Sequence, residues 1–215
     1  MEKLVIGITG GVGAGKSTVL NILQKEYQAE IILTDQVAHE LMQPGTSCYE
    51  EIVKVLGTEI LAEDGTFDKV KLGNLMFNDK NTVAMVNQIV HPAVRKETAA
   101  RIEASRKKLI VIESALLIEA NFKPLCDEIW YVYVSTQERV KRLYEQRGYS
   151  EVKSYSIIYN QLSHEQFRRN CDRLVDNGAS REYTRRQIRE FMKEITERMS
   201  GKEQISEEES GDGQA

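Results

Sequence analysis

The sequence feature that most constrains the fold is a glycine-rich stretch near the N terminus, residues 10–17, which reads GGVGAGKS. It fits the pattern G-x-x-x-x-G-K-[ST], in which backbone amides at the start of a helix wrap a polyphosphate. Residues 4–8 form a short apolar run typical of a buried strand, and apolar residues recur at helical spacing after Ser17. We therefore predict a strand, a phosphate-binding loop and a helix, and with them a site for a nucleoside triphosphate.

Each residue type in this loop has a physical role in holding phosphates. The glycines let the backbone approach the ligand closely. Lys16 supplies a mobile positive charge to the β- and γ-phosphates, and the Ser17 hydroxyl is placed to hold Mg²⁺ together with phosphate oxygens. The alternative is a glycine-rich turn that merely precedes a helix, which the flanking strand and helix disfavour. The motif predicts nucleotide binding and leaves the reaction open.

Length and composition predict one α/β domain over residues 1–199. The 215 residues, with 41% hydrophobic content, suffice for one sizeable core. Residues 200–215 hold one Lys and five acidic residues, so the net charge of −4 belongs to this tail, and the other 199 residues carry 28 charges of each sign. That balance gives no support to a general nucleic-acid or membrane surface. The tail has little apolar surface, and we expect it to be disordered.

The cysteines and the N terminus indicate a cytoplasmic protein. Cys48, Cys126 and Cys171 are odd in number and lack metal-ligand spacing, so we expect buried or partly buried thiols rather than a disulfide framework or a zinc site. No signal peptide precedes the first strand, and no apolar run approaches membrane-spanning length.

Further strands are expected at residues 31–33, 109–112 and 129–134, separated by helical patterns. This alternation predicts a parallel sheet with helices packed against it. A last helix is marked by an apolar stripe that can cover the sheet, formed by Ile188, Phe191, Met192, Ile195 and Met199.

Two regions are unlike simple crossover helices. Residues 35–107 are too long for one crossover and contain helical segments broken at 44–45 (PG), 63–65 (EDG) and 91–92 (HP), which favours an inserted substrate-binding part. Residues 137–172 are rich in Arg and Lys with acidic residues between them. They fit a mobile lid over phosphates, or alternatively a solvated helical face of mixed charge.

Two carboxylates follow predicted strands at the edge where open α/β sheets bind their ligands. Asp35 can orient an acceptor hydroxyl and take its proton, or alternatively cap the helix that follows it. Glu113 can bind Mg²⁺ directly or through water, and its neighbour Ser114 is a weaker candidate. Glu119 and His91 are further candidates for the site. Glu119 is alternatively an ordinary surface carboxylate, and His91 alternatively has a structural role.

The motifs, taken in order, resemble those of the dephospho-coenzyme A kinases over nearly the whole body of the chain. No later motif is specific alone, but their order and spacing are. The resemblance rests on residues 8–18 (ITGGVGAGKST), Asp35 with Val37 and Ala38, 44–45 (PG), 64–65 (DG), Phe77, 91–92 (HP), 113–119 (ESALLIE), Arg142 with Leu143, Gln161, and 172–178 (DRLVDNG).

The resemblance implies ATP-dependent transfer of the γ-phosphate to the ribose 3′-hydroxyl of dephospho-coenzyme A, the last step of coenzyme A synthesis. It implies a three-layer phosphate-loop kinase fold with a parallel sheet, in which residues 35–107 hold the coenzyme precursor and residues 137–172 form a helical lid. Asp35 is then the base, and Lys16, Arg142 and Arg147 complete the catalytic set.

The resemblance also implies the binding residues. The nucleotide would be held by Gly11, Val12, Gly13, Ala14, Gly15, Lys16, Ser17 and Thr18, with Asn177 and Gly178 against adenine. The acceptor would be held by Thr9, Asp35, His91, Leu116, Leu117 and Glu119, and Mg²⁺ by Ser17 and Glu113. Besides ATP and Mg²⁺, the only partner expected is this small-molecule acceptor.

The chain departs from the family pattern at several positions. The usual Asp-Ala-Asp reads Leu33-Thr34-Asp35, His39 stands where an Arg is common, and Ala115 replaces a Pro. The lid arginines are usually separated by three residues, whereas Arg142 and Arg147 have four between them. Which arginine reaches the phosphates is therefore open, and Arg139 is a competitor.

Four other functions are possible for a chain with a phosphate-binding loop, and each requires particular sequence features. Another small phosphate-loop kinase, acting on a nucleoside or nucleotide, would share the loop, base and lid, and would differ in the inserted region. A regulatory GTPase would need an Asn-Lys-x-Asp segment, which the chain lacks, and large motor or transporter ATPases are disfavoured by size. A nonenzymatic nucleotide-binding adaptor requires that Asp35 point away from the γ-phosphate.

Overall fold

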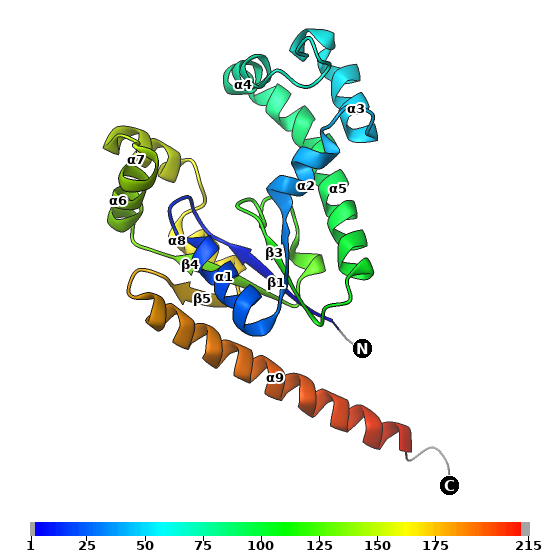
Figure 1. Ribbon diagram of the computed structural model, residues 1–215, viewed down its shortest axis with the longest axis vertical. Coiled ribbons are helices and arrows are strands. Elements are labelled where there is room, and N and C mark those ends of the chain that lie inside the picture. The colour runs from blue at the N-terminus through cyan, green and yellow to red at the C-terminus, as the bar shows by residue number, and fades with distance from the viewer. Residues whose placement is uncertain (1–2, 212–215) are drawn as a thin grey trace. The chain divides into compact units, whose positions relative to one another are not determined.

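Five parallel strands form one sheet in the order β2-β3-β1-β4-β5 (Figure 1). The computed structural model describes residues 3–211, apart from the side chains of residues 77–78 and 199–211. The four strands expected from the sequence are confirmed to within one residue at each end: β1 (Leu4–Thr9), β2 (Glu30–Leu33), β3 (Leu109–Glu113) and β4 (Glu128–Tyr133). The sequence did not predict β5 (Arg173–Asp176), because its residues, RLVD, place only two apolar side chains between charged ones.

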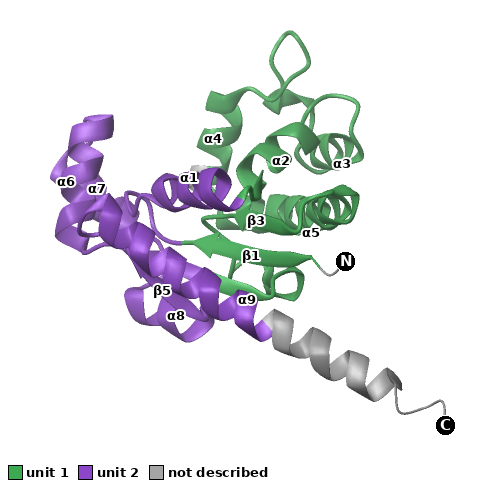
Figure 2. Ribbon diagram, turned by 60° about the horizontal axis from the view of Figure 1, so that its bottom comes forward, with its two compact units in different colours: residues 1–9, 28–129 green, residues 10–27, 130–215 purple. Residues whose placement is uncertain are grey.

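The chain is organised in two compact units, which Figure 2 shows in different colours. Unit 1 consists of residues 1–9 and 28–129, and unit 2 of residues 10–27 and 130–215. The chain leaves unit 1 at the end of β1. The phosphate loop therefore belongs to unit 2, whereas Asp35 and the inserted region belong to unit 1.

The strands of unit 1 pair in parallel, with β3 between β1 and β2. Ile8 and Leu33 both lie opposite Glu113, so the three strands end at one edge. All of β1 and most of β3 are buried, which explains their continuous apolar runs. The inserted region is helical, as expected, and contains α2 (Thr34–Leu41), α3 (Ser47–Leu56), the 3₁₀ turn η1 (Thr58–Ile60), α4 (Lys69–Asn78) and α5 (Lys80–Ala104).

Side-chain caps fix where three of these helices begin. Thr46, Asp68 and Asp79 each accept hydrogen bonds from first-turn N–H groups, of α3, α4 and α5 respectively. The expected breaks at residues 44–45 and 63–65 are present, since both lie between helices.

The expected break at residues 91–92 is wrong. Pro92 lies inside the 25-residue helix α5. Its missing N–H removes one backbone hydrogen bond, but Pro92 is exposed, and the packed face of the helix continues past it. That face is formed by the buried side chains of Val86, Val90, Val94 and Thr98. Packing along this row therefore overrides the local break signal.

Unit 1 also holds the 3₁₀ turn η2 (Lys123–Leu125), and unit 2 holds most of β4, the strand β5 and the remaining α-helices. The phosphate loop leads into α1 (Lys16–Tyr27), and β4 pairs with β5 from Trp130 to Tyr133. Serine side chains cap three short helices at their N termini: α6 (Thr136–Arg147), α7 (Glu151–Tyr159) and α8 (His164–Asn170). The chain then passes through β5 into α9 (Arg181–Gly211).

Helix α9 carries the expected apolar stripe. Ile188, Met192 and Ile195 are buried. Phe191 packs edge-on against the fully buried Trp130, with 5.4 Å between ring centroids. Met199 lies outside the described side chains. The stripe thus closes the core of unit 2, as expected.

The structure differs from the expectation for the start of the acidic tail. We expected disorder over residues 200–215, whereas α9 continues as a helix to Gly211. Glu, which has good helix propensity, is frequent in this stretch. Residues 212–215 lie outside the described residues, so disorder there stays a prediction.

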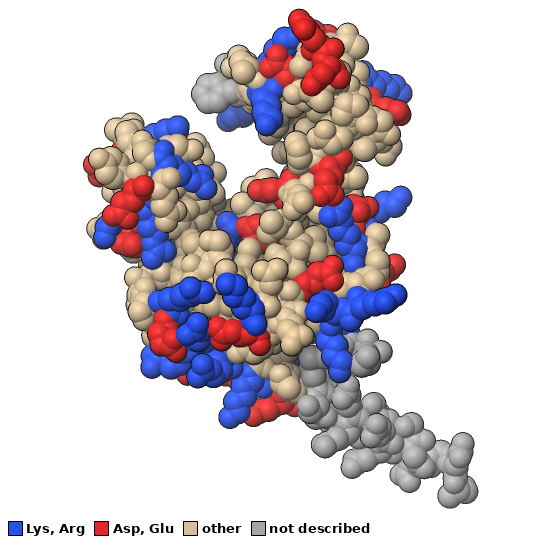
Figure 3. Space-filling model, in the orientation of Figure 1, with Lys and Arg blue, Asp and Glu red and all other residues tan. Residues whose placement is uncertain are grey.

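The cysteines, the absence of a membrane-spanning helix among the described residues and the surface charge can be compared with the expectations from the sequence. Among the described residues no disulfide joins the cysteines, and Cys48 is a buried thiol while Cys126 and Cys171 are partly buried. None of the described helices is both long and apolar enough to cross a membrane. On the face shown in Figure 3, basic and acidic side chains are intermixed, in keeping with the equal numbers of the two signs outside the tail.

Candidate functional site

Glycine conformations bend the phosphate loop of unit 2. Gly13 and Gly15 have φ angles of 78° and 79°, which residues with a Cβ atom rarely adopt. Helix α1 begins directly afterwards at Lys16, so the loop ends at a helix N terminus, which favours anions. The Lys16 ammonium donates to the carbonyl oxygen of Gly10 at 3.0 Å.

Two side chains from outside the loop bind its carbonyl groups. The Asn177 amide nitrogen donates to the carbonyl oxygens of Ala14 and Gly15, at 2.8 and 3.2 Å. Arg139 Nε donates to the carbonyl oxygen of Val12 at 2.8 Å. A carbonyl oxygen carries partial negative charge and would repel a phosphate. These hydrogen bonds therefore occupy carbonyl oxygens of the loop and leave its backbone N–H groups available to the anion.

Asn177 is itself held in one orientation. It follows β5, is buried, and its backbone N–H donates to Tyr133. Its side-chain oxygen accepts a hydrogen bond from the fully buried hydroxyl of Thr184, at 3.0 Å. Because the amide donates on one side and accepts on the other, Thr184 fixes which end faces the loop.

Arg139 is buried against the loop. Besides Val12 it binds Gln161, whose Oε1 also accepts the Val12 N–H at 3.0 Å. Burial lowers the pKa of Arg139 below its usual value, although an arginine stays protonated. A Cβ atom on Gly11 would lie 2.2 Å from the Arg139 guanidinium, so a side chain at this position would displace the guanidinium from its present contacts.

A pocket of about 260 Å³ opens beside the loop. It is lined by Gly13, Gly15, Ser17, Thr18, Arg142, Gln146, Asn177, Ala179 and Arg181. Half of the predicted nucleotide residues line it, and of the rest Gly11, Val12, Ala14 and Lys16 belong to the same loop. Gly178 is exposed and donates to Asp176 rather than lining the pocket. With two arginines and no carboxylate in its lining, the pocket suits a polyphosphate.

The structure separates the candidate lid arginines. Arg142 lines the pocket, pairs with Glu138 at 3.0 Å and donates to the carbonyl oxygen of Asn177 at 2.9 Å. Arg147 is exposed at the end of α6, with its guanidinium 6.0 Å from the centre of the Tyr149 ring. Arg139 holds the loop and does not line the pocket. Of the three, Arg142 therefore has the position to contact phosphates.

The residues present fit a magnesium ion that arrives with phosphate. The exposed Ser17 hydroxyl lines the pocket as a neutral oxygen ligand. The part of the chain that the structure describes holds no cluster of His, Cys, Asp or Glu that would bind a metal by itself. Mg²⁺ is usually held by few protein ligands together with substrate phosphates and water, and one hydroxyl beside a polyphosphate pocket matches that pattern.

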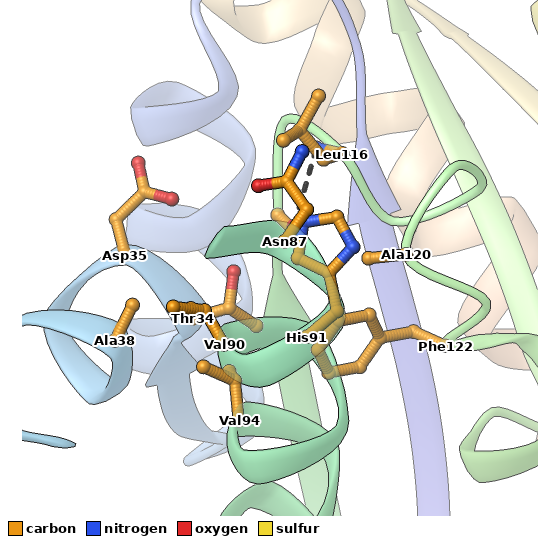
Figure 4. A pocket seen from close by; sticks show the side chains of 11 residues that line it. Thr34, Asp35, Ala38, Asn87, Val90, His91, Val94, Leu116, Ala120 and Phe122 are labelled. Atoms are coloured by element: carbon orange, nitrogen blue, oxygen red, sulfur yellow. Dashed lines mark hydrogen bonds between the residues drawn. The ribbon is translucent and has the colours of Figure 1, made fainter. Parts of the chain in front are cut away.

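Unit 1 has a separate pocket of about 180 Å³ around the start of α2. It is lined by Thr34, Asp35, Ala38, Asn87, Val90, His91, Val94, Ser114, Leu116, Ala120 and Phe122. Figure 4 shows Asp35 on α2 at one side and Asn87 and His91 on α5 at the other. The predicted acceptor residues Asp35, His91 and Leu116 are thus brought together.

Asp35 does not cap α2. The helix begins at Thr34, its N-cap position is Leu33, and no side-chain cap is formed there. The Asp35 carboxylate is exposed and accepts no hydrogen bond from the residues that the structure describes. The alternative role as a cap is therefore wrong, and the carboxylate remains available to a ligand.

His91 is half-buried in the wall of this pocket. Burial lowers the pKa of its imidazole below the usual 6.5, and the neighbouring Arg95 lowers it further. Arg95 is held by a hydrogen bond to the carbonyl oxygen of Ala120 at 2.7 Å. At neutral pH the lowered pKa favours the uncharged imidazole, which can donate or accept a hydrogen bond.

The other predicted acceptor and metal residues have different positions. Thr9 is fully buried, and its hydroxyl makes no hydrogen bond within the described structure. Glu113 is partly buried at the edge where the strands of unit 1 end. Leu117 is a fully buried core residue and Glu119 is exposed, and neither lines the pocket. Ser114, the weaker candidate, does line it.

Sequence reasoning missed several pocket residues. Asn87 lies one helical turn before His91, and that spacing on one helix face is the signal that could have found it. Gln146, Ala179 and Arg181 line the nucleotide pocket without any motif of their own. Thr184 acts through Asn177, so only the fold reveals it.

Comparisons with known proteins give a consistent result. A sequence model of the dephospho-CoA kinase family matches residues 4–182. A dephospho-CoA kinase of Carboxydothermus hydrogenoformans is 39% identical over 187 residues, which cover 86% of this chain and 90% of that enzyme. The crystal structure of TT1252 from Thermus thermophilus has a TM-score of 0.77 and 26% identity, covering 91% of this chain and 99% of the other. A dephospho-CoA kinase from Campylobacter jejuni shares the fold, with a TM-score of 0.63, 20% identity, and 90% and 97% coverage of the two chains.

Proposed function

Since the chain belongs to the dephospho-CoA kinase family, we propose that it transfers the γ-phosphoryl group of ATP to the ribose 3′-hydroxyl of dephospho-coenzyme A, giving coenzyme A and ADP. Membership of the family makes it an ATP-dependent kinase that acts on a small molecule. The structural observation that carries the proposal is the Asp35 carboxylate, which is exposed in the pocket of unit 1 and accepts no hydrogen bond from the described residues.

On the donor side, the chain provides positive charge in fixed positions. The loop amides and Lys16 bind the β- and γ-phosphates, and Arg142 neutralises charge that develops on the transferred group. Arg139, Asn177 and Gln161 keep the loop in shape, so no reorganisation is needed when the phosphates bind. Mg²⁺ bound with the triphosphate, held by the Ser17 hydroxyl, supplies further charge neutralisation, and Glu113 is the second residue that we propose for it.

On the acceptor side, Asp35 orients the ribose hydroxyl and takes its proton. The hydroxyl oxygen bonds to the γ-phosphorus while the bond from that phosphorus to the β–γ bridging oxygen breaks, and the hydroxyl proton passes to the Asp35 carboxylate. Asn87 and His91 face Asp35 across the pocket and can hydrogen-bond the same ribose or its base. We infer that Leu116 contributes apolar contact there.

The test is turnover of purified protein with ATP, Mg²⁺ and dephospho-coenzyme A, followed by formation of ADP and coenzyme A. A panel of nucleosides and nucleoside monophosphates serves as competing acceptors. We expect turnover on dephospho-coenzyme A to exceed that on every member of the panel. Turnover confined to a nucleoside or nucleotide would replace the proposal with another small phosphate-loop kinase. We expect the reaction to take place in the cytoplasm, where three thiols outside disulfides are stable.

A further inference from the structure

Arg181 lines the nucleotide pocket of unit 2 but has no role in the mechanism described so far. It is the first residue of α9, and its side chain is exposed. The other arginine in the lining, Arg142, comes from α6 and pairs with Glu138 at 3.0 Å. The pocket therefore has two arginines from two different helices, and the function of the second is unassigned.

The charge of Arg181 is not neutralised within the described part of the chain. Its guanidinium donates to the side-chain oxygen of Asn21 at 3.2 Å and forms no ion pair with a described residue. The neighbouring carboxylates of Glu182 and Glu26 both pair with Arg185 instead, at 2.7 and 2.8 Å. A guanidinium has five N–H donors, so Arg181 keeps both its positive charge and several donors for a ligand in the pocket.

The hydrogen bond to Asn21 determines where this charge lies along α1. Asn21 comes four residues after Ser17, so the two side chains lie on the same face of the helix, about 6 Å apart along its axis. Ser17 lies at the loop end of α1, where the β- and γ-phosphates bind in the proposed mechanism. Arg181 is thus held one helical turn beyond that position, which matches the α-phosphate, the next group of the nucleotide towards the ribose.

The backbone at the start of α9 has the same electrostatic preference. The Ser180 hydroxyl accepts the N–H of Tyr183 at 3.2 Å, which fixes the first turn from which the Arg181 side chain extends. Ala179, just before this turn, also lines the pocket. The N-terminal end of a helix carries partial positive charge, so helix and arginine both favour an anion. A neutral nucleobase would gain much less from this charge than a phosphate.

We propose that Arg181 binds the α-phosphate of the nucleotide and that Asn21 is its positioning residue. The inference rests on the proposed function and adds to it a second phosphate-binding arginine. The α-phosphate is present in both ATP and ADP and is not transferred. Arg181 therefore contributes to the binding of both nucleotides, whereas Arg142 acts on the group that is transferred.

The test measures the dissociation constants of ATP and ADP by calorimetric titration, together with kcat. Arg181→Ala should raise both dissociation constants by the same factor, roughly 3- to 10-fold, the range for a charge-assisted contact at an exposed position, and should leave kcat unchanged. Arg181→Lys should restore part of the affinity, because it keeps the charge. The matched control is Arg186→Ala, which removes the same charge from an exposed position of α9 outside the pocket and should change neither constant.

The role of Asn21 is tested by combining variants. Asn21→Ala should raise both dissociation constants less than Arg181→Ala does, because the arginine remains but is no longer held in place. In the Arg181→Ala background the same substitution should have no further effect on either constant. Effects of Asn21→Ala and Arg181→Ala that simply add would contradict the positioning role of Asn21.

The possible outcomes for Arg181 are distinct. Added salt should reduce the difference between the wild type and Arg181→Ala, because the lost contact is electrostatic. Unchanged dissociation constants in Arg181→Ala would overturn the proposal, and so would a loss confined to ATP, which would assign the charge to the γ-phosphate. A loss that neither Arg181→Lys nor salt reduces would overturn it in favour of contact with the base. Because the titrations need no acceptor, a wild type that binds both nucleotides without phosphorylating dephospho-coenzyme A would overturn the proposed function alone.

Discussion

The side-chain amide nitrogen of Asn177 lies 2.8 Å from the carbonyl oxygen of Ala14, and so joins the end of β5 to the phosphate loop. The hydroxyl of Thr184, 3.0 Å from the oxygen of the same amide, keeps Asn177 in the orientation that this bond requires. Loop geometry in unit 2 therefore depends on a residue of α9 that neither belongs to the loop nor lines the pocket.

We predict that Thr184→Val weakens nucleotide binding. The variant keeps the shape of the side chain but leaves the buried Asn177 oxygen without its donor, at a cost of about 1–3 kcal/mol in the free energy of unfolding. The KM for ATP should rise several-fold, whereas the KM for the acceptor should not change. Thr184→Ser, which retains the hydroxyl, is the control, and it should restore the KM for ATP. Equal constants for the valine and serine variants would contradict the positioning role.

We predict that Asp35→Asn lowers kcat by about 10²- to 10⁴-fold, the usual contribution of a positioned general base. The amide is nearly the same size as the carboxylate but accepts a proton far less readily. ATP affinity, measured by equilibrium binding, should be unchanged. The matched control is Gln36→Ala, at the next, exposed position of α2, which should retain wild-type turnover. A kcat of Asp35→Asn near that of the wild type would remove Asp35 from the chemistry.

We predict that the two lid arginines differ in importance. Arg142→Ala should lower kcat/KM by about 10²-fold, because Arg142 lines the nucleotide pocket and its charge faces the phosphates. Arg147→Ala removes an exposed side chain that lies over Tyr149 and should change kcat/KM much less. Steady-state kinetics of the two variants decides between them. The reverse order would show that Arg147 reaches the phosphates during turnover.

We predict that His91 makes folding stability depend on pH below neutrality. Its pKa is lower in the folded protein than the unfolded value of 6.5, mainly because of burial, so the unfolded state binds the proton more readily. The stabilising contribution is complete above pH 6.5 and declines as the pH falls below it. His91→Gln should flatten that decline in chemical denaturation. In the wild type, the His91 imidazole NMR signal is identified by its absence from the spectrum of His91→Gln. It should titrate below pH 6.5, and titration at or above that value would contradict the prediction.

The sequence predicted those parts of the fold that leave a local pattern. The phosphate loop, four strands and the α9 stripe follow from glycine spacing, apolar runs and helical periodicity. The continuity of α5 through Pro92 did not follow, because the row of buried valines packs against residues distant in sequence. Strand β5 was missed because its position depends on pairing with β4 rather than on its own residues.

The same distinction holds for the two pockets. Asp35 and the loop residues were predictable because the motif or the end of a strand places them. Arg181 was not, since it lies in a helix with no local sign of which face meets a pocket, and the only signal for Asn87 was its spacing of one helical turn from His91. Arg139 was weighed as a ligand for phosphates. Its burial and its bond to Val12 show instead that it supports the loop, which depends on the fold of α6 against residues 10–15.

Because Arg139 lies so close to Gly11, the effect of a substitution at one of these two positions depends on the residue at the other. Any side chain at position 11 collides with the guanidinium. A shorter residue at position 139 loses the hydrogen bonds to the Val12 carbonyl oxygen and to Gln161. Each single step is therefore harmful, although the double change would remove the collision. In related proteins we therefore expect glycine at position 11 wherever position 139 is an arginine. Where position 139 holds a shorter residue, alanine or serine should be tolerated at position 11.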